Sequence, residues 1–288
     1  MIAVLIAGSV AMMLSLFGTR ALISFFDSIG KGQPILGSDD HGPVHHMKKQ
    51  GTATMGGIAI MVSAFVGWAV AHLRGGIALS DQAMIMWAIC GILSVVGFLD
   101  DFLKVRHAQN RGIFWKKKGQ ITFGLVVVMM TWLLLGTGVS ETLSFTRFDL
   151  PGWNLSPVLW VVWTSVMVWA TTNAVNVTDG LDGLAAGSAL FGFLAFTVIA
   201  YWAFRNPDIY NLVNPLDLAV FSAAMAGACG GFLWWNAAPA RIFMGDVGAL
   251  ALGGALGTIA VIVRQEIVLF VMGGIFVRLL SSRAPVKP

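Results

Sequence analysis

The sequence predicts an all-α fold, a polytopic transmembrane helical bundle of about nine spans. Of its 288 residues, 57% are hydrophobic and only 11% are charged, whereas a soluble domain carries about 25% charged residues. Apolar runs of roughly 17–25 residues, the length that crosses a bilayer as a helix, recur along the chain. The run 125–135 does not alternate apolar and polar residues, which excludes a membrane β-barrel. We expect a single integral-membrane domain over residues 1–288.

The expected spans follow from the apolar runs. They lie near residues 1–19, 54–73, 83–103, 121–138, 157–174, 184–204, 217–235, 247–263 and 267–280. The first basic residue, Arg20, follows the first apolar run, which is the wrong charge order for a cleaved signal peptide. We therefore expect a first transmembrane helix whose N-terminus lies outside.

The distribution of basic residues tests this orientation, because cytoplasmic loops of membrane proteins are rich in Lys and Arg. Of the 18 Lys and Arg residues, fourteen fall in or beside the segments that this orientation assigns to the cytoplasm. The four on the other side are Arg74, Arg147, Arg205 and Arg264. The net charge of +4 thus follows the membrane topology, and we expect no nucleic-acid partner.

Carboxylates at the membrane boundary are the most informative residues, because each costs roughly 2.5–3.5 kcal/mol at a helix centre. Asp100 and Asp101 end one span, and Asp246 begins another. Between them in the chain, a loop carries Asn176, Asp179 and Asp182, which would share one face if the loop is partly helical. The orientation places all of these residues on the cytoplasmic side.

Carboxylates beside amides, without thiolates, suit a hard cation such as Mg²⁺. Nearby lysines would hold a diphosphate, and the glycines of the segment 51–57 (GTATMGG) would let backbone amides approach an anion. Two structural alternatives stay open. A boundary aspartate can cap a helix or pair with a lysine, and the run 116–118 (KKK) can anchor the chain at anionic lipids. Three acidic clusters on one side favour the functional interpretation.

These motifs resemble a known family. The segment 51–57, the pair Asp100 and Asp101, the segment 173–183 and the stretch 232–246 look like the phospho-N-acetylmuramoyl-pentapeptide transferase family. That family belongs to the polyprenyl-phosphate N-acetylhexosamine-1-phosphate transferases. The resemblance covers residues 1–277, with the motifs in the family's order and spacing, and the Thr-x-Thr-Met-Gly-Gly motif favours the muramoyl-pentapeptide branch.

The resemblance implies a reaction: Mg²⁺-dependent transfer of phospho-MurNAc-pentapeptide from UDP-MurNAc-pentapeptide to undecaprenyl phosphate, giving lipid I and UMP. It implies a multi-pass protein of the bacterial inner (cytoplasmic) membrane, among membrane lipid, with its active site facing the cytoplasm. The resemblance also suggests a homodimer.

The resemblance also implies roles for individual residues. Asp246 would be a Mg²⁺ ligand, and Asp100 and Asp101 would lie beside the metal, one of them acting as base on the lipid phosphate. Asn176 and Asp179 would line the metal and sugar-phosphate region. Three residues would contact uridine, namely Lys49, Asp182 and Phe243, the last by stacking. Those completing the polar pocket would be Thr54, Lys104, Lys118, Asn173 and Asn236.

The chain departs from the family in two places. Ala53 stands where the family has proline between two threonines. Family members also continue after the segment 273–277 (GGIFV) through a histidine-rich cytoplasmic loop to a last span, whereas this sequence stops at Pro288 and has no histidine after His107. We therefore expect a form truncated at the C-terminus.

Three other functions remain open at this stage. A related enzyme would transfer GlcNAc-1-phosphate from UDP-GlcNAc to the polyprenyl phosphate. An inactive truncated form would only bind substrate. An ion-coupled carrier would also carry intramembrane acids, but near the bilayer midplane on broken helices.

Overall fold

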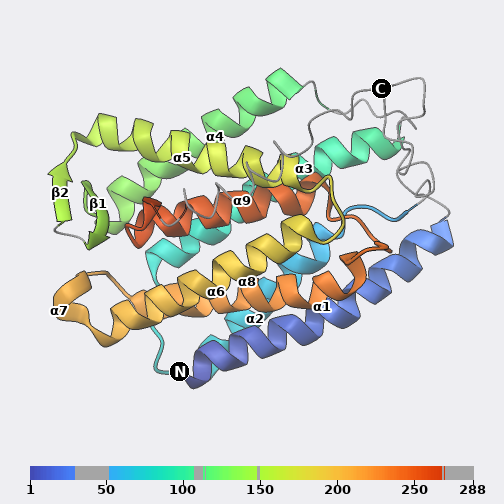
Figure 1. Ribbon diagram of the computed structural model, residues 1–288, viewed down its shortest axis with the longest axis horizontal. Coiled ribbons are helices and arrows are strands. Elements are labelled where there is room, and N and C mark those ends of the chain that lie inside the picture. Colours follow the sequence, from blue (N-terminus) through green and yellow to red (C-terminus); the bar gives the residue numbers. More distant parts are fainter. Residues whose placement is uncertain (30–51, 107–112, 114, 148–149, 268, 270–288) are drawn as a thin grey trace, which may run out of the picture.

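The chain folds into a bundle of long helices (Figure 1). The computed structural model describes residues 1–29, 52–106, 113, 115–147, 150–267 and 269. In chain order the elements are α1 (Ile2–Ile29), α2 (Gly57–Leu73), α3 (Asp81–Arg106), α4 (Trp115–Thr137), β1 (Thr142–Arg147), β2 (Leu150–Asn154), α5 (Pro157–Thr178), α6 (Leu184–Arg205), α7 (Pro207–Tyr210), α8 (Pro215–Asn236) and α9 (Gly245–Ile262).

The helical membrane fold predicted from the sequence is confirmed. Seven of the helices, all except α2 and α7, are long and apolar enough to cross a membrane. Helix α2 is equally apolar but has 17 residues, a length of about 25 Å at 1.5 Å per residue. Eight of the nine expected spans thus coincide with helices, and the ninth, 267–280, lies almost entirely outside the described residues.

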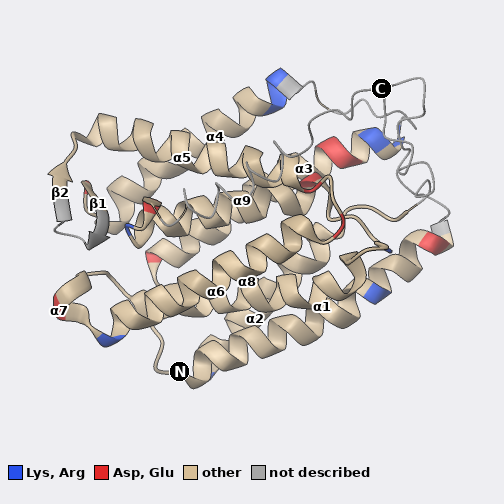
Figure 2. Ribbon diagram, in the orientation of Figure 1, with Lys and Arg blue, Asp and Glu red and all other residues tan. Residues whose placement is uncertain are grey.

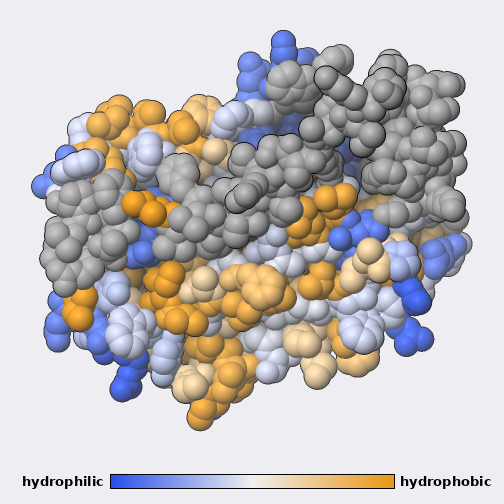
Figure 3. All heavy atoms as spheres, viewed as in Figure 1, coloured by the Kyte–Doolittle hydropathy of each residue, from blue (hydrophilic) through white to orange (hydrophobic). Residues whose placement is uncertain are grey.

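Helices α8 and α9 form the centre of the bundle. In their most apolar windows 78% and 89% of the residues are buried, against 28% in α1 and 22% in α4. Helix α8 packs between α1 and α6, and α9 packs between α3 and α5. Hydrophobic side chains gather across the middle of the face seen in Figure 3, and the charged residues lie mainly near the helix ends (Figure 2).

Two small elements were not predicted. Strands β1 and β2 form an antiparallel hairpin between α4 and α5, and the four-residue helix α7 follows α6. Both lie at the left end of the bundle in Figure 1, away from the adjoining ends of α3 and α9. They were missed because a hydropathy pattern locates spans and carries little information about short loops between them.

A buried carboxylate holds the helix ends together at that same end of the bundle. Asp217, in the first turn of α8, accepts hydrogen bonds from Trp68 Nε1 (2.7 Å) and from the backbone and side chain of Ser80 (both 2.8 Å). His72 Nε2 lies 3.2 Å from the same carboxylate. Asp217 therefore ties α2 and the start of α3 to α8, which satisfies a charge that would otherwise be costly to bury.

Helices α1 and α8 pack backbone against backbone at Gly227. A Cβ atom placed there would lie 2.0 Å from the carbonyl oxygen of Gly8. We expect Gly227→Ala to lower the free energy of unfolding by about 1–3 kcal/mol, because neither backbone can move without disturbing its helix. Thermal unfolding of the purified protein in detergent measures this.

The matched control is Gly91→Ala in α3, where an added Cβ meets nothing within 4 Å. Alanine favours a helix over glycine, so this variant should unfold at the wild-type temperature or above it. Equal effects of the two substitutions would contradict the packing explanation.

Candidate active site

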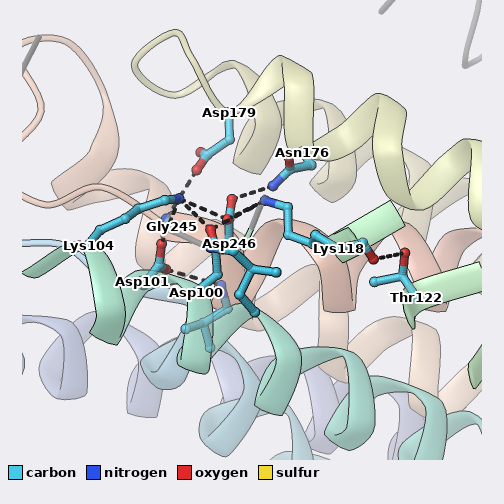
Figure 4. Close-up of polar contacts among 11 residues, drawn as sticks. Asp100, Asp101, Lys104, Lys118, Thr122, Asn176, Asp179, Gly245 and Asp246 are labelled. Atoms are coloured by element: carbon cyan, nitrogen blue, oxygen red, sulfur yellow. Dashed lines mark hydrogen bonds and ion pairs between the residues drawn. The ribbon is translucent and has the colours of Figure 1, made fainter. Parts of the chain in front are cut away.

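Three carboxylates converge where α3 ends and α9 begins. Asp100 and Asp101 come from the last turns of α3, and Asp246 comes from the first turn of α9. Each offers one oxygen, and these oxygens all lie within 4.8 Å of one another (Figure 4). The structure thus brings these three acids together at one end of the bundle, and that this end faces the cytoplasm stays a prediction.

Close backbone contact makes this convergence possible. A Cβ on Gly97, in α3, would lie 2.2 Å from the carbonyl oxygen of Asp246. A Cβ on Gly57, at the start of α2, would lie 2.1 Å from the amide nitrogen of Gly248. The first turn of α9 therefore touches the backbones of both α2 and α3, and Asp246 is carried to the side of Asp100.

Two lysines neutralise the carboxylates. Lys104 Nζ lies 2.6 Å from Asp100 Oδ2, 3.5 Å from Asp101 Oδ1 and 3.0 Å from Asp246 Oδ2. Lys118, from the first turn of α4, lies 2.7 Å from Asp246 Oδ2 and 3.4 Å from Asp100 Oδ2. Without these ammonium groups, like charges so close together would strongly resist ionisation.

The end of α5 supplies two further polar groups. Asn176 Nδ2 donates to Asp246 Oδ1 at 2.5 Å, and Asp179 Oδ2 accepts a hydrogen bond from the Gly245 amide at 3.1 Å (Figure 4). Burial, reinforced by the nearby carboxylates of Asp246 and Asp101, raises the pKa of Asp179 well above its usual value. Asn176 and Asp179 are therefore hydrogen-bonded to the first turn of α9.

Asp182 does not continue the face that Asn176 and Asp179 form. Helix α5 ends at Thr178 with Asp179 as its cap. Asp182 therefore lies beyond the helix and does not share a helical face with Asn176 and Asp179. Its carboxylate instead accepts a hydrogen bond from the Ala240 amide at 3.1 Å.

The segment after Gly51 pairs with the chain that enters α9. The Ala53 carbonyl accepts the Phe243 amide at 2.8 Å, and the Gly56 and Gly57 amides donate to the carbonyls of Phe243 and Met244 at 3.0 and 2.9 Å. The Gly56 and Gly57 amides already bind carbonyl groups and therefore do not hold an anion, whereas Gly51, the third glycine of the predicted segment, lies outside the described residues. The change from proline to Ala53 leaves the carbonyl contact intact.

Thr54 lies beside the carboxylates. Its side chain is buried, and its hydroxyl oxygen has no hydrogen-bond partner among the described residues. A Cβ on Gly245 would lie 3.2 Å from this oxygen and 2.4 Å from Asp101 Oδ2. The hydroxyl oxygen thus lies near Gly245, directly before Asp246 in the chain.

Asn236 clamps two loops together. Its amide oxygen accepts the Gly183 amide at 3.1 Å, and its amide nitrogen donates to the Ile242 carbonyl at 2.9 Å. Both ends of this buried side chain are thus engaged by the backbone. Asn236 fixes the turn after α5 against the segment that leads into α9, on which Asp246 depends.

The other predicted site residues are Asn173, Phe243 and Lys49. Asn173 is one turn before Asn176 on α5, and its amide donates to the Trp169 carbonyl at 2.7 Å. Phe243 has a half-buried side chain in the segment that pairs with Ala53. Lys49 lies outside the described residues.

Two contacts were not predicted from the sequence. The Ile113 amide donates to Asp100 Oδ1 at 2.6 Å, and Trp169 Nε1 donates to the Gly119 carbonyl at 3.0 Å, joining α5 to the start of α4. An isoleucine amide and a tryptophan in an apolar helix carry no pattern that could have revealed either contact.

The donor set suits a hard divalent cation. The three carboxylates present oxygen ligands, Asn176 turns its amide nitrogen toward Asp246, and the two cysteines, Cys90 and Cys229, are buried elsewhere in α3 and α8. Mg²⁺ is usually held by one or two carboxylates together with substrate phosphates. The carboxylates can therefore bind a cation while the lysines neutralise a phosphate.

Comparisons with known proteins agree with this chemistry. The family model described as glycosyl transferase family 4 matches residues 82–264. Curated proteins named phospho-N-acetylmuramoyl-pentapeptide-transferase are similar along nearly the whole chain. The protein of Beutenbergia cavernae is 39% identical, covering 98% of this chain and 83% of its own length. For Streptomyces griseus the values are 40%, 97% and 82%, and for Mycobacterium tuberculosis 42%, 97% and 81%.

Gly245 has a backbone conformation that only glycine adopts readily, with φ of +74°. We expect Gly245→Ala to reduce catalytic activity at least tenfold, because the added Cβ would meet the Asp101 carboxylate and the left-handed conformation would be strained. Initial rates of product release measure this. Gly18→Ala in α1, where a Cβ meets nothing within 4 Å, should keep wild-type activity.

Replacing Asn236 should destabilise the protein. Asn236→Leu leaves the Gly183 amide and the Ile242 carbonyl without partners, and we expect the free energy of unfolding to fall by about 1–3 kcal/mol. Thermal unfolding provides the measurement. Asn154→Leu, at an exposed position of β2, is the control, and a loss of equal size there would argue against the clamp.

Proposed function

We propose a specific reaction for this protein. The premise is that the chain belongs to glycosyl transferase family 4 and within it to the phospho-N-acetylmuramoyl-pentapeptide-transferase family. The protein is a multi-pass bacterial membrane protein and a transferase of peptidoglycan synthesis. In our proposal it transfers phospho-MurNAc-pentapeptide from UDP-MurNAc-pentapeptide to undecaprenyl phosphate in a Mg²⁺-dependent reaction. The products are lipid I and UMP.

The observation that carries the proposal is the cluster of Asp100, Asp101 and Asp246 with two lysines at the ends of membrane helices. Phosphoryl transfer depends mostly on positioning and on neutralising charge. Three carboxylates alone would repel a diphosphate, and two lysines alone would give no cation site. The combination of both fits a diphosphate donor that binds together with a divalent cation.

Asp246 and Asp100 would hold Mg²⁺, with Asn176 and Asp179 completing the polar surround. When bound, the cation neutralises phosphate oxygens and favours departure of the leaving group. Lys104 and Lys118 supply further positive charge to the diphosphate. An oxygen of the acceptor phosphate bonds to the phosphorus that carries the sugar, and the bond from that phosphorus to the oxygen of UMP breaks.

Asp101 is the better candidate for the base. Asp100 receives the Ile113 amide at 2.6 Å and Lys104 at 2.6 Å, so its oxygens are firmly engaged. Asp101 has longer contacts, with the Val247 amide at 3.4 Å and Lys104 at 3.5 Å. A phosphate monoester loses its second proton with a pKa of about 6, so a carboxylate such as Asp101 can remove it near neutral pH.

The position of the site supports a lipid acceptor and a cytoplasmic donor. Exposed apolar side chains, those of Phe98, Leu99 and Phe102, flank the carboxylates on α3, so a lipid phosphate can approach from the membrane while its chain stays among lipids. The excess of basic residues at this side of the chain favours an inner-membrane protein whose site faces the cytoplasm.

The test is release of UMP from purified protein supplied with Mg²⁺, undecaprenyl phosphate and either UDP-MurNAc-pentapeptide or UDP-GlcNAc. We expect turnover with the muramoyl-pentapeptide donor and loss of turnover when Mg²⁺ is chelated. Turnover with UDP-GlcNAc alone would show the related GlcNAc-1-phosphate activity. Absence of turnover with both donors would remove the proposed reaction.

Asp246→Asn should lower UMP release at least about a hundredfold, because several kcal/mol of charge stabilisation depend on this carboxylate. Asp208→Asn, at an exposed position of α7 at the other end of the bundle, is the matched control and should keep wild-type turnover. Similar rates for the two variants would contradict the assigned role of Asp246.

A further inference from the structure

We propose that Lys118 couples the binding of the divalent cation to the binding of the donor diphosphate. Its ammonium group and the cation compete for Asp246, and the diphosphate relieves the competition by taking the ammonium group. The inference rests on the proposed function, since it assumes a nucleoside diphosphate donor and a divalent cation at the same cluster.

The competition follows from the contacts of Asp246. Its Oδ1 atom receives Asn176 Nδ2, and its Oδ2 atom lies 2.7 Å from Lys118 Nζ and 3.0 Å from Lys104 Nζ (Figure 4). A cation bound to Oδ2 would meet two ammonium groups at contact distance. Because like charges repel most strongly where little water screens them, at least one ammonium group has to leave.

Lys104 is the less able of the two to move away. It belongs to the same helix as Asp100 and Asp101, one turn further on, and it keeps its 2.6 Å contact with Asp100 when the contact with Asp246 is lost. Its position satisfies the i, i+4 spacing that favours ion pairs on helices. Lys104 therefore remains as the counter-charge of the α3 carboxylates.

Lys118 is the one that can exchange partners. It reaches the cluster from a different helix, and its contact with Asp100 is longer, 3.4 Å. The backbone around it is fixed, because Trp169 Nε1 donates to the Gly119 carbonyl and Thr122 Oγ1 donates to the Lys118 carbonyl. Rotation of the side chain alone can thus carry the ammonium group from Asp246 to a phosphate.

The start of α4 also favours an anion. Lys116 and Lys117 share the first turn of α4 with Lys118, at the helix end that carries a partial positive charge. Lysines at this end are destabilised by the helix dipole, whereas a phosphate is stabilised by it. A diphosphate near this turn therefore improves the electrostatics of the helix, and the cation replaces the ammonium group of Lys118 as the counter-charge of Asp246.

The consequence is a thermodynamic linkage. A nucleoside diphosphate should tighten cation binding, and the cation should tighten diphosphate binding by the same factor. We expect a factor on the order of tenfold in the wild-type protein, within the usual range of such couplings. Removing the Lys118 charge should separate the two binding events.

The experiment measures binding of Mn²⁺ to the purified full chain, by the electron paramagnetic resonance signal of free Mn²⁺, with and without UDP. Lys118→Gln should bind Mn²⁺ about tenfold more tightly than wild type without UDP, and UDP should then tighten Mn²⁺ binding much less. Arg205→Gln is the control, since it removes the same charge from an exposed position at the end of α6, at the other end of the bundle, and should leave both values unchanged. Lys104→Gln should keep the UDP effect.

Three results would overturn the inference: no effect of UDP on Mn²⁺ binding in the wild type, weaker or unchanged Mn²⁺ binding in Lys118→Gln, or equal behaviour of the Arg205 and Lys118 variants. Thermal unfolding of each variant checks that it is folded. Because Mn²⁺ binding needs no turnover, the two proposals fail separately. Coupled binding without UMP release would remove only the proposed reaction, and UMP release with uncoupled binding would remove only the role of Lys118.

Discussion

The contact between the first turn of α9 and the backbones of α2 and α3 is the constraint on which the site depends. Glycines at positions 57, 97 and 248 leave no side chain between these segments, so Asp246 comes within reach of Asp100 and Asp101. A side chain at Gly97 would separate the helices and move the acids apart. The chemistry of the cluster is therefore a consequence of helix packing deep in the bundle.

The segment before α9 is held as firmly as the helix itself. Backbone groups of Phe243 and Met244 pair with residues 53–57. Asn236, at the end of α8, binds the Ile242 carbonyl, and Asp182, in the turn after α5, binds the Ala240 amide. Asp246 is thus positioned by three distant parts of the sequence. Rigid support of this kind is what phosphoryl transfer requires, since its rate depends largely on placing charge correctly.

Charge balance explains how so many acids tolerate one another near a membrane. Lys104 contacts all three aspartates, and Lys118 contacts Asp100 and Asp246. The amides of Ile113, Val247 and Asn176 supply further donors. Structural pairing with lysine, which is an alternative to a functional role when each aspartate is considered alone, is therefore compatible with the proposed site. The same lysines that make the cluster stable are suited to neutralise a substrate phosphate.

The sequence by itself determined the class of fold and the positions of eight of the helices, because hydropathy acts locally along the chain. It also determined the family, through motifs that are short and ordered. Only the tertiary structure decided that Asn236 and the amides of Gly56 and Gly57 bind backbone groups, that Asp182 leaves the face of Asn176, and that Lys118 shares Asp246 with Lys104. These contacts join residues from separate helices, and the distance between helices is set by the packing of whole surfaces, which no local pattern records.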